Sequence, residues 1–313
     1  MSTRRATAAL LVSVLALTGC TGTGEDREPH RGTLQAAAVA GALDRVTGPV
    51  VVAVGDIACP PGDKVTADEC RQARTARLAK SFAPRRALLL GDLQYDDGSL
   101  AQFRGSYADS WGDLRAVSRP VPGNHEYHTP GAEGFFRYFR DQTPPHPGYY
   151  SFRVGTWRVY ALNSNCGQVD CTRQLRWLDR AMTRHHPRCS AVMMHHPRYS
   201  SGDEHGSTTE VRPFWRVALR HRTDVALAGH DHGYERFRRM DASGQPARRG
   251  MLSFVSGAGG RSLYGFDEAE TGSMVRDARA AGVLALRFGE RRFAWVYRTI
   301  DGRRVDAGVR RCV

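Results

Sequence analysis

The sequence predicts an α/β fold in which two mixed β-sheets pack face to face with helices outside, a four-layer αββα sandwich. Short apolar runs alternate with helical patterns between residues 50 and 228, which is typical of strand–helix–strand units. After residue 232 the chain changes to strands with little helix between them. Five of the apolar runs end in Asp, Asn or His, as strands do when they carry functional side chains to one edge of a sheet.

The five runs share one form, an apolar strand followed at once by a polar side chain. They are Val50–Asp56, Leu88–Tyr95, Val121–Glu126, Val192–His196 and Val225–His232. The carboxyl ends of parallel strands lie at one edge of a sheet, so we expect these side chains to converge. Asp92 directly follows three consecutive leucines and is expected at the centre of the group.

Helical patterns separate these strands. We expect helices near 67–82, 100–115, 172–184 and 211–221, and a helical turn at 135–140. Ser99 is placed to cap the second helix. The segment 172–184 is amphipathic, with Leu175, Leu178 and Met182 on one face.

Hairpin patterns account for most of the remaining strands. Residues 149–162 alternate around Gly155-Thr156 and predict a hairpin with a tight turn. Further strands are expected at 251–256, 283–288 and 293–298. The polar, glycine-containing segments 239–249 and 264–280 are expected to be loops.

The first residues have the pattern of an export signal. Arg4 and Arg5 precede an apolar run, 6–17, that is too short to span a bilayer and suits a signal peptide. The run ends in Leu17-Thr18-Gly19-Cys20, which resembles the lipobox of bacterial lipoproteins, whose cysteine is diacylated. An ordinary cleaved signal with an incidental cysteine is the alternative.

This pattern divides the chain into three parts. Residues 1–19 are expected to be a signal peptide, 20–47 a flexible tether without apolar periodicity, and 48–313 one large catalytic domain. The expected location is extracytoplasmic, with the protein lipid-anchored to a bacterial cell membrane through Cys20.

The charge is strongly basic and spread along the chain. Lys and Arg number 45 against 32 Asp and Glu, a formal net charge of +13, and signal removal takes away only Arg4 and Arg5. No basic stripe with interleaved aromatics and no nucleic-acid motif accompanies this charge, so nucleic acid is not an expected partner. Attraction of phosphate anions and adhesion to an anionic envelope both fit.

The cysteines predict disulfides. Of seven, six remain if Cys20 carries lipid, and an even number in an exported protein favours pairing. Short loops favour Cys59–Cys70 and Cys166–Cys171, and Cys189–Cys312 then follows by elimination. A zinc–thiolate site is the alternative, and no Cys-x-x-Cys pair supports it.

The polar residues at the strand ends have the chemistry of a two-metal site. Two ions about 4 Å apart need a shared anionic bridge, and Asp92 can give one carboxylate oxygen to each. Neutral imidazoles and an amide oxygen can fill other positions without cancelling the Lewis acidity of the ions. The residues with these chemistries are Asp56, Asn124, His195, His230 and His232.

With these five motifs in this order, the chain resembles the calcineurin-like metallophosphoesterases over roughly residues 50–260. General members of that superfamily begin with Asp-x-His, whereas this chain has Asp56-Ile57-Ala58. The purple acid phosphatase branch also lacks that histidine and has a tyrosine three residues after the bridging aspartate. Tyr95 stands at that position, so the resemblance is to this branch.

The resemblance implies a role for each matching residue. It implies that the first metal is held by Asp56, Tyr95 and His232. It implies that the second metal is held by Asn124, His195 and His230, and that Asp92 bridges the two. A phenolate ligand favours Fe(III), so the implied pair is Fe(III) with Zn, Mn or Fe(II), and a metal-bound hydroxide would attack phosphorus in line.

Further residues resemble the groups that surround the metals in that branch. His125 resembles an outer-sphere histidine that steadies the phosphate or protonates the leaving alkoxide, and His205 resembles a second one. Glu126 and His196 are weaker candidates, Glu126 as a residue that orients a neighbour.

The chain also departs from the branch. We expect it to lack the N-terminal β-sandwich domain that plant purple acid phosphatases carry. The first motif ends in Ala58 and not Gly, so a Tyr95 that points away, beside an ordinary Zn or Mn site, stays open.

The expected function is therefore hydrolysis of phosphate esters outside the cytoplasm by a binuclear metallophosphoesterase. Phosphomonoesterase activity is the first choice, and a phosphodiesterase acting on nucleotides or glycerophosphodiesters is the alternative. A non-catalytic metal-binding envelope protein is the alternative of another class, and it predicts a broken ligand set. The expected partner is a small phosphate ester, with membrane contact only through the lipid on Cys20 and no protein partner.

Overall fold

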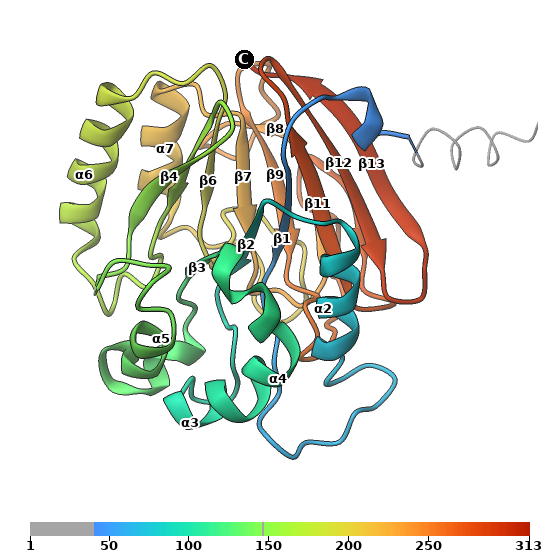
Figure 1. Cartoon of the computed structure of the whole chain (residues 1–313). Helices are drawn as coiled ribbons and strands as arrows, with labels where there is room; N and C mark the ends of the chain where they lie inside the picture. The colour runs from blue at the N-terminus through green and yellow to red at the C-terminus, as the bar shows by residue number, and fades with distance from the viewer. Residues whose placement is uncertain (1–40, 146) are drawn as a thin grey trace, which may run out of the picture.

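The computed structural model describes residues 41–145 and 147–313, which form two β-sheets packed face to face (Figure 1). Sheet 1 has the strand order β13-β12-β11-β1-β2-β3, and sheet 2 has the order β10-β8-β9-β7-β6-β5-β4. The predicted signal peptide and Cys20 lie outside the described residues.

The strands of each sheet are short, as expected from the lengths of the apolar runs. Those of sheet 1, in chain order, are β1 (Val50–Val54), β2 (Arg86–Leu90), β3 (Ser118–Val121), β11 (Gly282–Phe288), β12 (Arg292–Thr299) and β13 (Arg304–Arg311). Those of sheet 2 are β4 (Tyr150–Val154), β5 (Trp157–Ala161), β6 (Ser190–Met193), β7 (Val225–Ala228), β8 (Tyr234–Met240), β9 (Met251–Ser256) and β10 (Ser273–Asp277).

Both sheets are mixed, as predicted. In sheet 1, β1, β2 and β3 are parallel, and β11 pairs antiparallel with β1. In sheet 2, β5, β6, β7 and β9 are parallel, while β4 and β8 pair antiparallel with their neighbours. The parallel parts of the two sheets are the parts whose ends carry the polar motifs.

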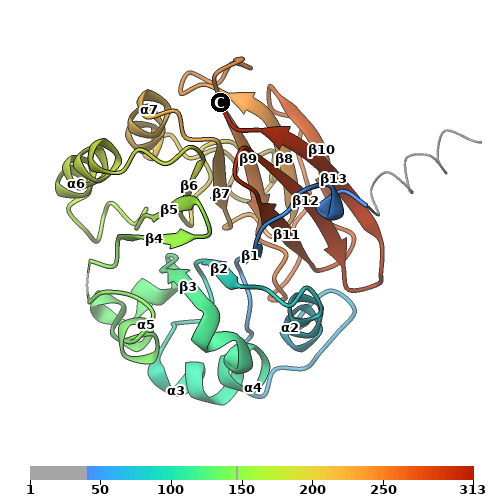
Figure 2. The same ribbon diagram turned by 45° about the horizontal axis from the view of Figure 1, so that its top comes forward.

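Helices cover the outer face of each sheet (Figures 1 and 2). Those beside sheet 1 are α2 (Gln72–Ser81), α3 (Leu100–Gln102), η2 (Phe103–Tyr107), α4 (Ala108–Trp111), η3 (Gly112–Val117) and α5 (Glu133–Tyr138). Those beside sheet 2 are α6 (Cys171–Arg184) and α7 (Arg212–Arg220). Short 3₁₀ turns complete the set: η1 (Leu43–Arg45), η4 (His125–His128) and η5 (Pro130–Ala132).

Alternation along the strands separates the core into three layers. On β1, Val51 and Ala53 face the layer between the sheets, whereas Val52 and Val54 face the helices over sheet 1. On β6, Val192 faces the layer that packs against α6 and α7. This period of two follows from the pleat and confirms the predicted αββα sandwich.

Three strands lie where none was expected. β8 is rich in charge, and a bulge between Arg236 and Arg239 breaks its alternation, so the periodicity that identifies a strand is lost. β10 lies inside the segment 264–280 that was expected to be a loop, and β13 is an edge strand with exposed arginines.

Two expected helices differ in detail. The predicted helix 67–82 begins only at Gln72, after a turn-rich segment. The predicted helix 100–115 is helical to Val117, but it changes from α to π to α to 3₁₀ geometry along its length. Ser99 caps it as expected, because its side chain accepts a hydrogen bond from the backbone of Gln102.

The folded part begins before residue 48. Ala42 and Val46 are buried, and η1 contacts β12, so the last residues of the predicted tether 20–47 belong to the domain. The boundary at 48 is too late because the segment 42–46 carries only two core side chains and shows no periodicity. Within the described part of the chain, no helix has the length and apolarity needed to cross a bilayer.

Candidate metal centre

The carboxyl ends of five parallel strands from both sheets meet at one edge of the molecule. Asp56 follows β1, Asp92 follows β2 and Asn124 follows β3, all from sheet 1. His195 follows β6, and His230 and His232 follow β7, from sheet 2. The sequence predicted this convergence from the strand ends alone.

Three of these residues have unusual backbone conformations. Asp56, Asp92 and His230 have φ angles of 60°, 48° and 77°, in the left-handed region that non-glycine residues rarely adopt. Such conformations cost about 1–3 kcal/mol each and are typical of functional sites. The backbone N–H of His230 donates to Asp56 Oδ2 at 2.9 Å, which ties a turn of sheet 2 to a carboxylate of sheet 1.

One group of ligand-type atoms surrounds the hydroxyl of Tyr95. Its Oη lies 3.1 Å from Asp56 Oδ1, 3.2 Å from Asp92 Oδ2 and 3.0 Å from His232 Nε2. Tyr95 therefore points into the site and not away from it. The residues that the resemblance implies as first-metal ligands therefore lie next to Asp92, the implied bridge.

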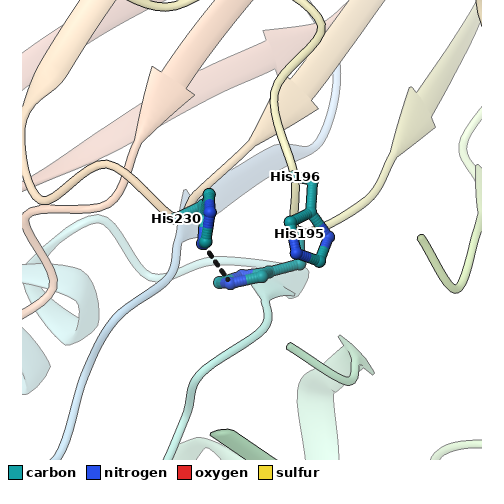
Figure 3. Close-up of side chains that lie close together, drawn as sticks. All are labelled: His195, His196 and His230. Atoms are coloured by element: carbon teal, nitrogen blue, oxygen red, sulfur yellow. Dashed lines mark hydrogen bonds between the residues drawn. The ribbon is translucent and has the colours of Figure 1, made fainter. Parts of the chain in front are cut away.

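A second group surrounds His195. Its Nε2 lies 2.9 Å from Asn124 Oδ1, 3.3 Å from Asp92 Oδ2 and 3.1 Å from His230 Nδ1. Figure 3 shows the rings of His195 and His230 joined by this contact, with His196 beside them. Asp92 thus touches both groups, as expected of a bridging carboxylate.

The histidines expected outside the metal ligands also lie in the cluster. His125 Nε2 is 4.0 Å from Asp92 Oδ2, and its ring lies 4.2 Å from that of Tyr95. The ring of His205 stacks on that of His230 at 4.1 Å. His196 contacts the rings of His195 and His230 and hydrogen-bonds to Ser164 Oγ at 2.8 Å.

Glu126 orients the loop that carries Asp92. Its buried carboxylate accepts hydrogen bonds from the backbone N–H groups of Asp92 (3.0 Å), Leu93 (2.8 Å), Gln94 (3.3 Å) and Gly123 (2.6 Å). Gly123 must be glycine at this point, because a Cβ there would lie 2.0 Å from Asp92 Oδ1. The orienting role expected of Glu126 is therefore seen in its contacts.

Charge and burial set the protonation of the cluster. Although burial opposes it, His195 and His125 hold the pKa of Asp92 well below its usual value. Burial, then the carboxylates of Asp92 and Asp56, raise the pKa of Tyr95 well above its usual value. Ionisation of the Tyr95 phenol, which the family resemblance implies, therefore needs a strong cation beside it.

The donor set fits a cation. His195 Nδ1 lies 2.9 Å from the carbonyl oxygen of Leu90, which can only accept, so Nδ1 donates. Although burial opposes it, the carboxylates of Asp92 and Asp56 raise the pKa of His195 to about 9, so without a metal Nε2 carries a proton toward Asp92 and Asn124. A metal ion bound here would take the place of this proton, because either positive charge offsets the repulsion between the lone pairs that converge at Nε2. Potential ligand atoms of Asp56, Asp92 and His195, and those of His195, His196 and His230, lie within 4.8 Å of one another.

The cysteines do not compete for metal. The structure has the disulfides Cys59–Cys70, Cys166–Cys171 and Cys189–Cys312. All three predicted pairs are confirmed. The zinc–thiolate alternative has no support, because every described cysteine is paired.

Three neighbours of the cluster were not predicted. Ser262 Oγ hydrogen-bonds to His232 Nδ1 at 2.8 Å, the ring of Tyr264 stacks on that of His232 at 3.9 Å, and Arg261 lies over the ring of Tyr95. All three follow the glycine-rich stretch 257–260 at the end of β9. The glycines directly after the strand were the available signal in the sequence, because glycine lets the backbone of one segment approach another closely.

Comparison with known proteins matches this site to a family. The sequence pattern described as calcineurin-like phosphoesterase matches residues 49–234, more than half of the chain. A phosphoenolpyruvate phosphatase of Allium cepa is 33% identical over 178 residues, covering 49% of this chain and 36% of that protein. An Fe(3+)-Zn(2+) purple acid phosphatase of Arabidopsis thaliana is 28% identical over 178 residues, covering 49% and 37%.

A solved structure has a similar fold. The purple acid phosphatase PPD1 from yellow lupin (Lupinus luteus) seeds aligns with a TM-score of 0.68 at 18% identity, over 84% of this chain and 54% of that one. This chain therefore spans less than two fifths of the length of the two curated relatives and about half of the lupin chain.

Proposed function

The chain belongs to the calcineurin-like phosphoesterase family, and from this we propose that it is an extracytoplasmic, purple acid phosphatase-like phosphomonoesterase. Its general class, a metallophosphoesterase, comes with the family. The monoester preference, the metals and the location are our proposals. The convergence of Tyr95, Asp56 and Asp92 within 3.2 Å is the observation that supports the purple acid phosphatase-like site most directly.

We assign the ligands of each metal from the two groups of atoms described above, one around the Tyr95 hydroxyl and one around His195 Nε2. Asp56, Tyr95 and His232 would hold one metal, with Fe(III) favoured because burial keeps the phenol protonated beside a weaker cation. Asn124, His195 and His230 would hold a second ion, Zn, Mn or Fe(II), and Asp92 would contact both. When bound, the two ions would supply Lewis acidity to the phosphoryl oxygens and to water.

The residues around the ligands would position and protonate the substrate. His125 Nε2 lies 4.0 Å from Asp92 Oδ2, so a phosphate at the metals would meet this imidazole, which we propose steadies it or gives a proton to the leaving alkoxide. His205 stacks on His230 from another side and would contact the same phosphate. Glu126 would hold Asp92 in place through the backbone N–H groups of the loop.

The disulfides support the proposed location. Three disulfides favour an oxidising compartment outside the cytoplasm. Attachment to the membrane by a lipid on Cys20 is part of the proposal, and its test is mass spectrometry of the protein recovered from membranes.

The first test is hydrolysis by the metal-loaded 41–313 domain. We expect p-nitrophenyl phosphate to be hydrolysed faster than bis(p-nitrophenyl) phosphate. Asp92→Asn should lower kcat at least about a hundredfold, because the charge that both groups share is lost. Asp109→Asn, an exposed carboxylate outside the site, is the matched control and should keep wild-type activity.

Each outcome has a clear meaning. Full activity in Asp92→Asn would contradict the two-metal mechanism. A faster reaction with the diester would favour the phosphodiesterase alternative. A wild-type protein with two bound metals and neither activity would favour the non-catalytic alternative.

The second test is the visible spectrum of the iron-loaded protein. We expect a tyrosinate-to-iron charge-transfer band that Tyr95→Phe abolishes. Tyr264→Phe should keep the band, because among the described residues Tyr264 meets the proposed ligands only by stacking its ring on that of His232. Two bound metals without such a band in the wild type would assign an ordinary Zn or Mn site.

A further inference from the structure

A cavity lies at the opposite end of the strands from the metal centre. It has a volume of about 880 Å³ and is lined by residues at the start of β6, before β7, at the β11–β12 turn and at the end of β13. Ser190 begins β6 at this cavity, whereas His195 follows the end of β6 at the metal centre. The length of β6 alone separates the two by about 13 Å.

The cavity is strongly cationic. Six arginines line it, together with three histidines and no Asp or Glu among the described residues: Arg188, Arg220, Arg222, Arg291, Arg292 and Arg311. Asp179 neutralises only part of this charge, through Arg220 at 3.0 Å and His221 at 2.8 Å. The other five arginines form no ion pair with a carboxylate of the described chain. The buried carboxylate of Asp224 lies behind the lining, where it accepts hydrogen bonds from the backbone N–H groups of Ser190 and Val313.

The strand pairing places like charges opposite one another. Arg292 at the start of β12 is the direct partner of Arg311 near the end of β13. Like charges at directly opposed positions of an antiparallel pair destabilise the pair. An anion between the two guanidinium groups would remove this repulsion.

The floor of the cavity carries a buried hydroxyl without a partner. Tyr160 is 1% exposed and lines the cavity, and its Oη has no hydrogen-bond partner in the described structure. Buried hydroxyl groups are normally paired, so this one is unusual, but its oxygen is itself covered and does not open into the cavity.

The Cys189–Cys312 disulfide holds the walls together. It joins the residue before β6 of sheet 2 to the residue after β13 of sheet 1. Arg188 and Arg311 each adjoin one of its cysteines. The disulfide therefore fixes arginines from both sheets around one space, a pre-organised arrangement that lowers the entropy cost of binding.

We propose that this cavity binds a phosphate-bearing anion. Guanidinium groups form paired, charge-assisted hydrogen bonds with phosphate oxygens, and five arginines without carboxylate partners suit an anion of more than one charge. The ligand is either a soluble phosphate or the headgroup of an anionic phospholipid. The site is separate from the metal centre and independent of the reaction proposed there.

The test compares two variants of the metal-loaded 41–313 domain with equal charge loss. The cavity variant is Arg222→Gln with Arg292→Gln and Arg311→Gln. The control variant is Arg77→Gln with Arg104→Gln and Arg173→Gln, three exposed arginines outside the cavity. Both should hydrolyse p-nitrophenyl phosphate as the wild type does, because neither touches the metal centre.

Two probes distinguish the sources of phosphate. Inorganic phosphate is titrated calorimetrically, and the binding at the metal centre, which both variants keep, is separated from binding in the cavity by comparison with the control variant. Flotation is measured with vesicles of phosphatidylglycerol and phosphatidylcholine against phosphatidylcholine alone. We expect the cavity variant to lose binding to at least one probe by about tenfold or more, since charge-assisted hydrogen bonds are lost, and the control variant to keep it. Added salt should weaken the wild-type interaction.

The pattern of loss identifies the ligand. Loss of inorganic phosphate binding assigns a soluble anion, and loss of vesicle binding alone assigns a lipid headgroup. Equal binding of both probes by the cavity and control variants would overturn the proposal.

Discussion

The two nitrogen atoms of each histidine have different tasks at the metal centre. His195 donates from Nδ1 to the carbonyl oxygen of Leu90, which leaves Nε2 for the metals. His232 is held in the same way, with Nδ1 at Ser262 Oγ and Nε2 at Asp56 and Tyr95. These outer contacts fix the ring orientation before any ion binds, which is how a protein tunes the affinity of a metal site.

Two neighbouring histidines offer a matched test at this scale. His125 and His128 both contact the carbonyl oxygen of Asp96 through Nδ1, at 2.7 and 2.9 Å, but only the Nε2 of His125 lies near Asp92. We expect His125→Ala to lower kcat for p-nitrophenyl phosphate about a hundredfold, since a positioned acid is lost. Steady-state kinetics should show His128→Ala close to wild type. Equal losses in the two variants would contradict the role given to His125.

Among the elements, the edge strands connect the two sheets. β10 is the outer strand of sheet 2, and its last residue, Asp277, is buried. Asp277 pairs with Arg303, in the turn between β12 and β13 of sheet 1, at 2.6 Å, and with Arg279 at 2.8 Å. A carboxylate between arginines thus joins the far edges of the sandwich.

This connection predicts a pH-dependent contribution to stability. Although burial opposes it, the hydrogen bonds from Arg303 and Arg279 lower the pKa of Asp277. A pKa lower in the folded than in the unfolded state stabilises the fold above the unfolded value, about pH 4, and the gain is lost as pH falls through the folded value. Asp277→Asn should therefore cost about 1–3 kcal/mol at neutral pH, where a charged hydrogen-bond partner is lost.

Urea unfolding at pH 7 and below pH 4 measures this effect. The difference between Asp277→Asn and the wild type should shrink at the lower pH. Asp113→Asn, which breaks an exposed ion pair with Lys80, is the control and should change stability much less. A difference that stays constant with pH would show that packing, and not charge, accounts for the loss.

For the molecule as a whole, the metal centre acts as a link between the sheets. Asp56, Asp92 and Asn124 come from sheet 1, whereas His195 and His230 come from sheet 2. Ions bound between them would therefore stabilise the whole sandwich and not one loop. Binding to the folded state alone raises the free energy of unfolding.

Metal removal should lower the melting temperature. At a metal concentration about a hundred times Kd the stabilisation is about 2.7 kcal/mol, so chelation should lower Tm by about 5 °C or more. Differential scanning calorimetry before and after chelation and dialysis makes the measurement. In Asp92→Asn the chelator should change Tm much less. An equal shift in both proteins would place the stabilising ion elsewhere.

The sequence was sufficient for features that depend on short stretches of chain. The five apolar runs showed where strands end, because a buried strand needs consecutive apolar residues and a polar residue marks its exit from the core. The same reasoning found Asp56, Asp92 and His230, and short loops found two of the disulfides. It failed for β8, where a bulge breaks the alternation, and for β10 and β13 at the edges, where few side chains are buried.

Only the tertiary structure decided which distant segments meet. The stretch 261–264 reaches the metal centre from the end of β9, and the arginine-lined cavity combines the start of β6 with the turn after β11 and the end of β13. No local pattern predicts these contacts, since they depend on how the two sheets align at each end. The chain by itself thus determined the layered fold and the set of polar residues that meet at the strand ends. The arginine-lined cavity forms because packing of the two sheets brings the start of β6 beside the end of β13.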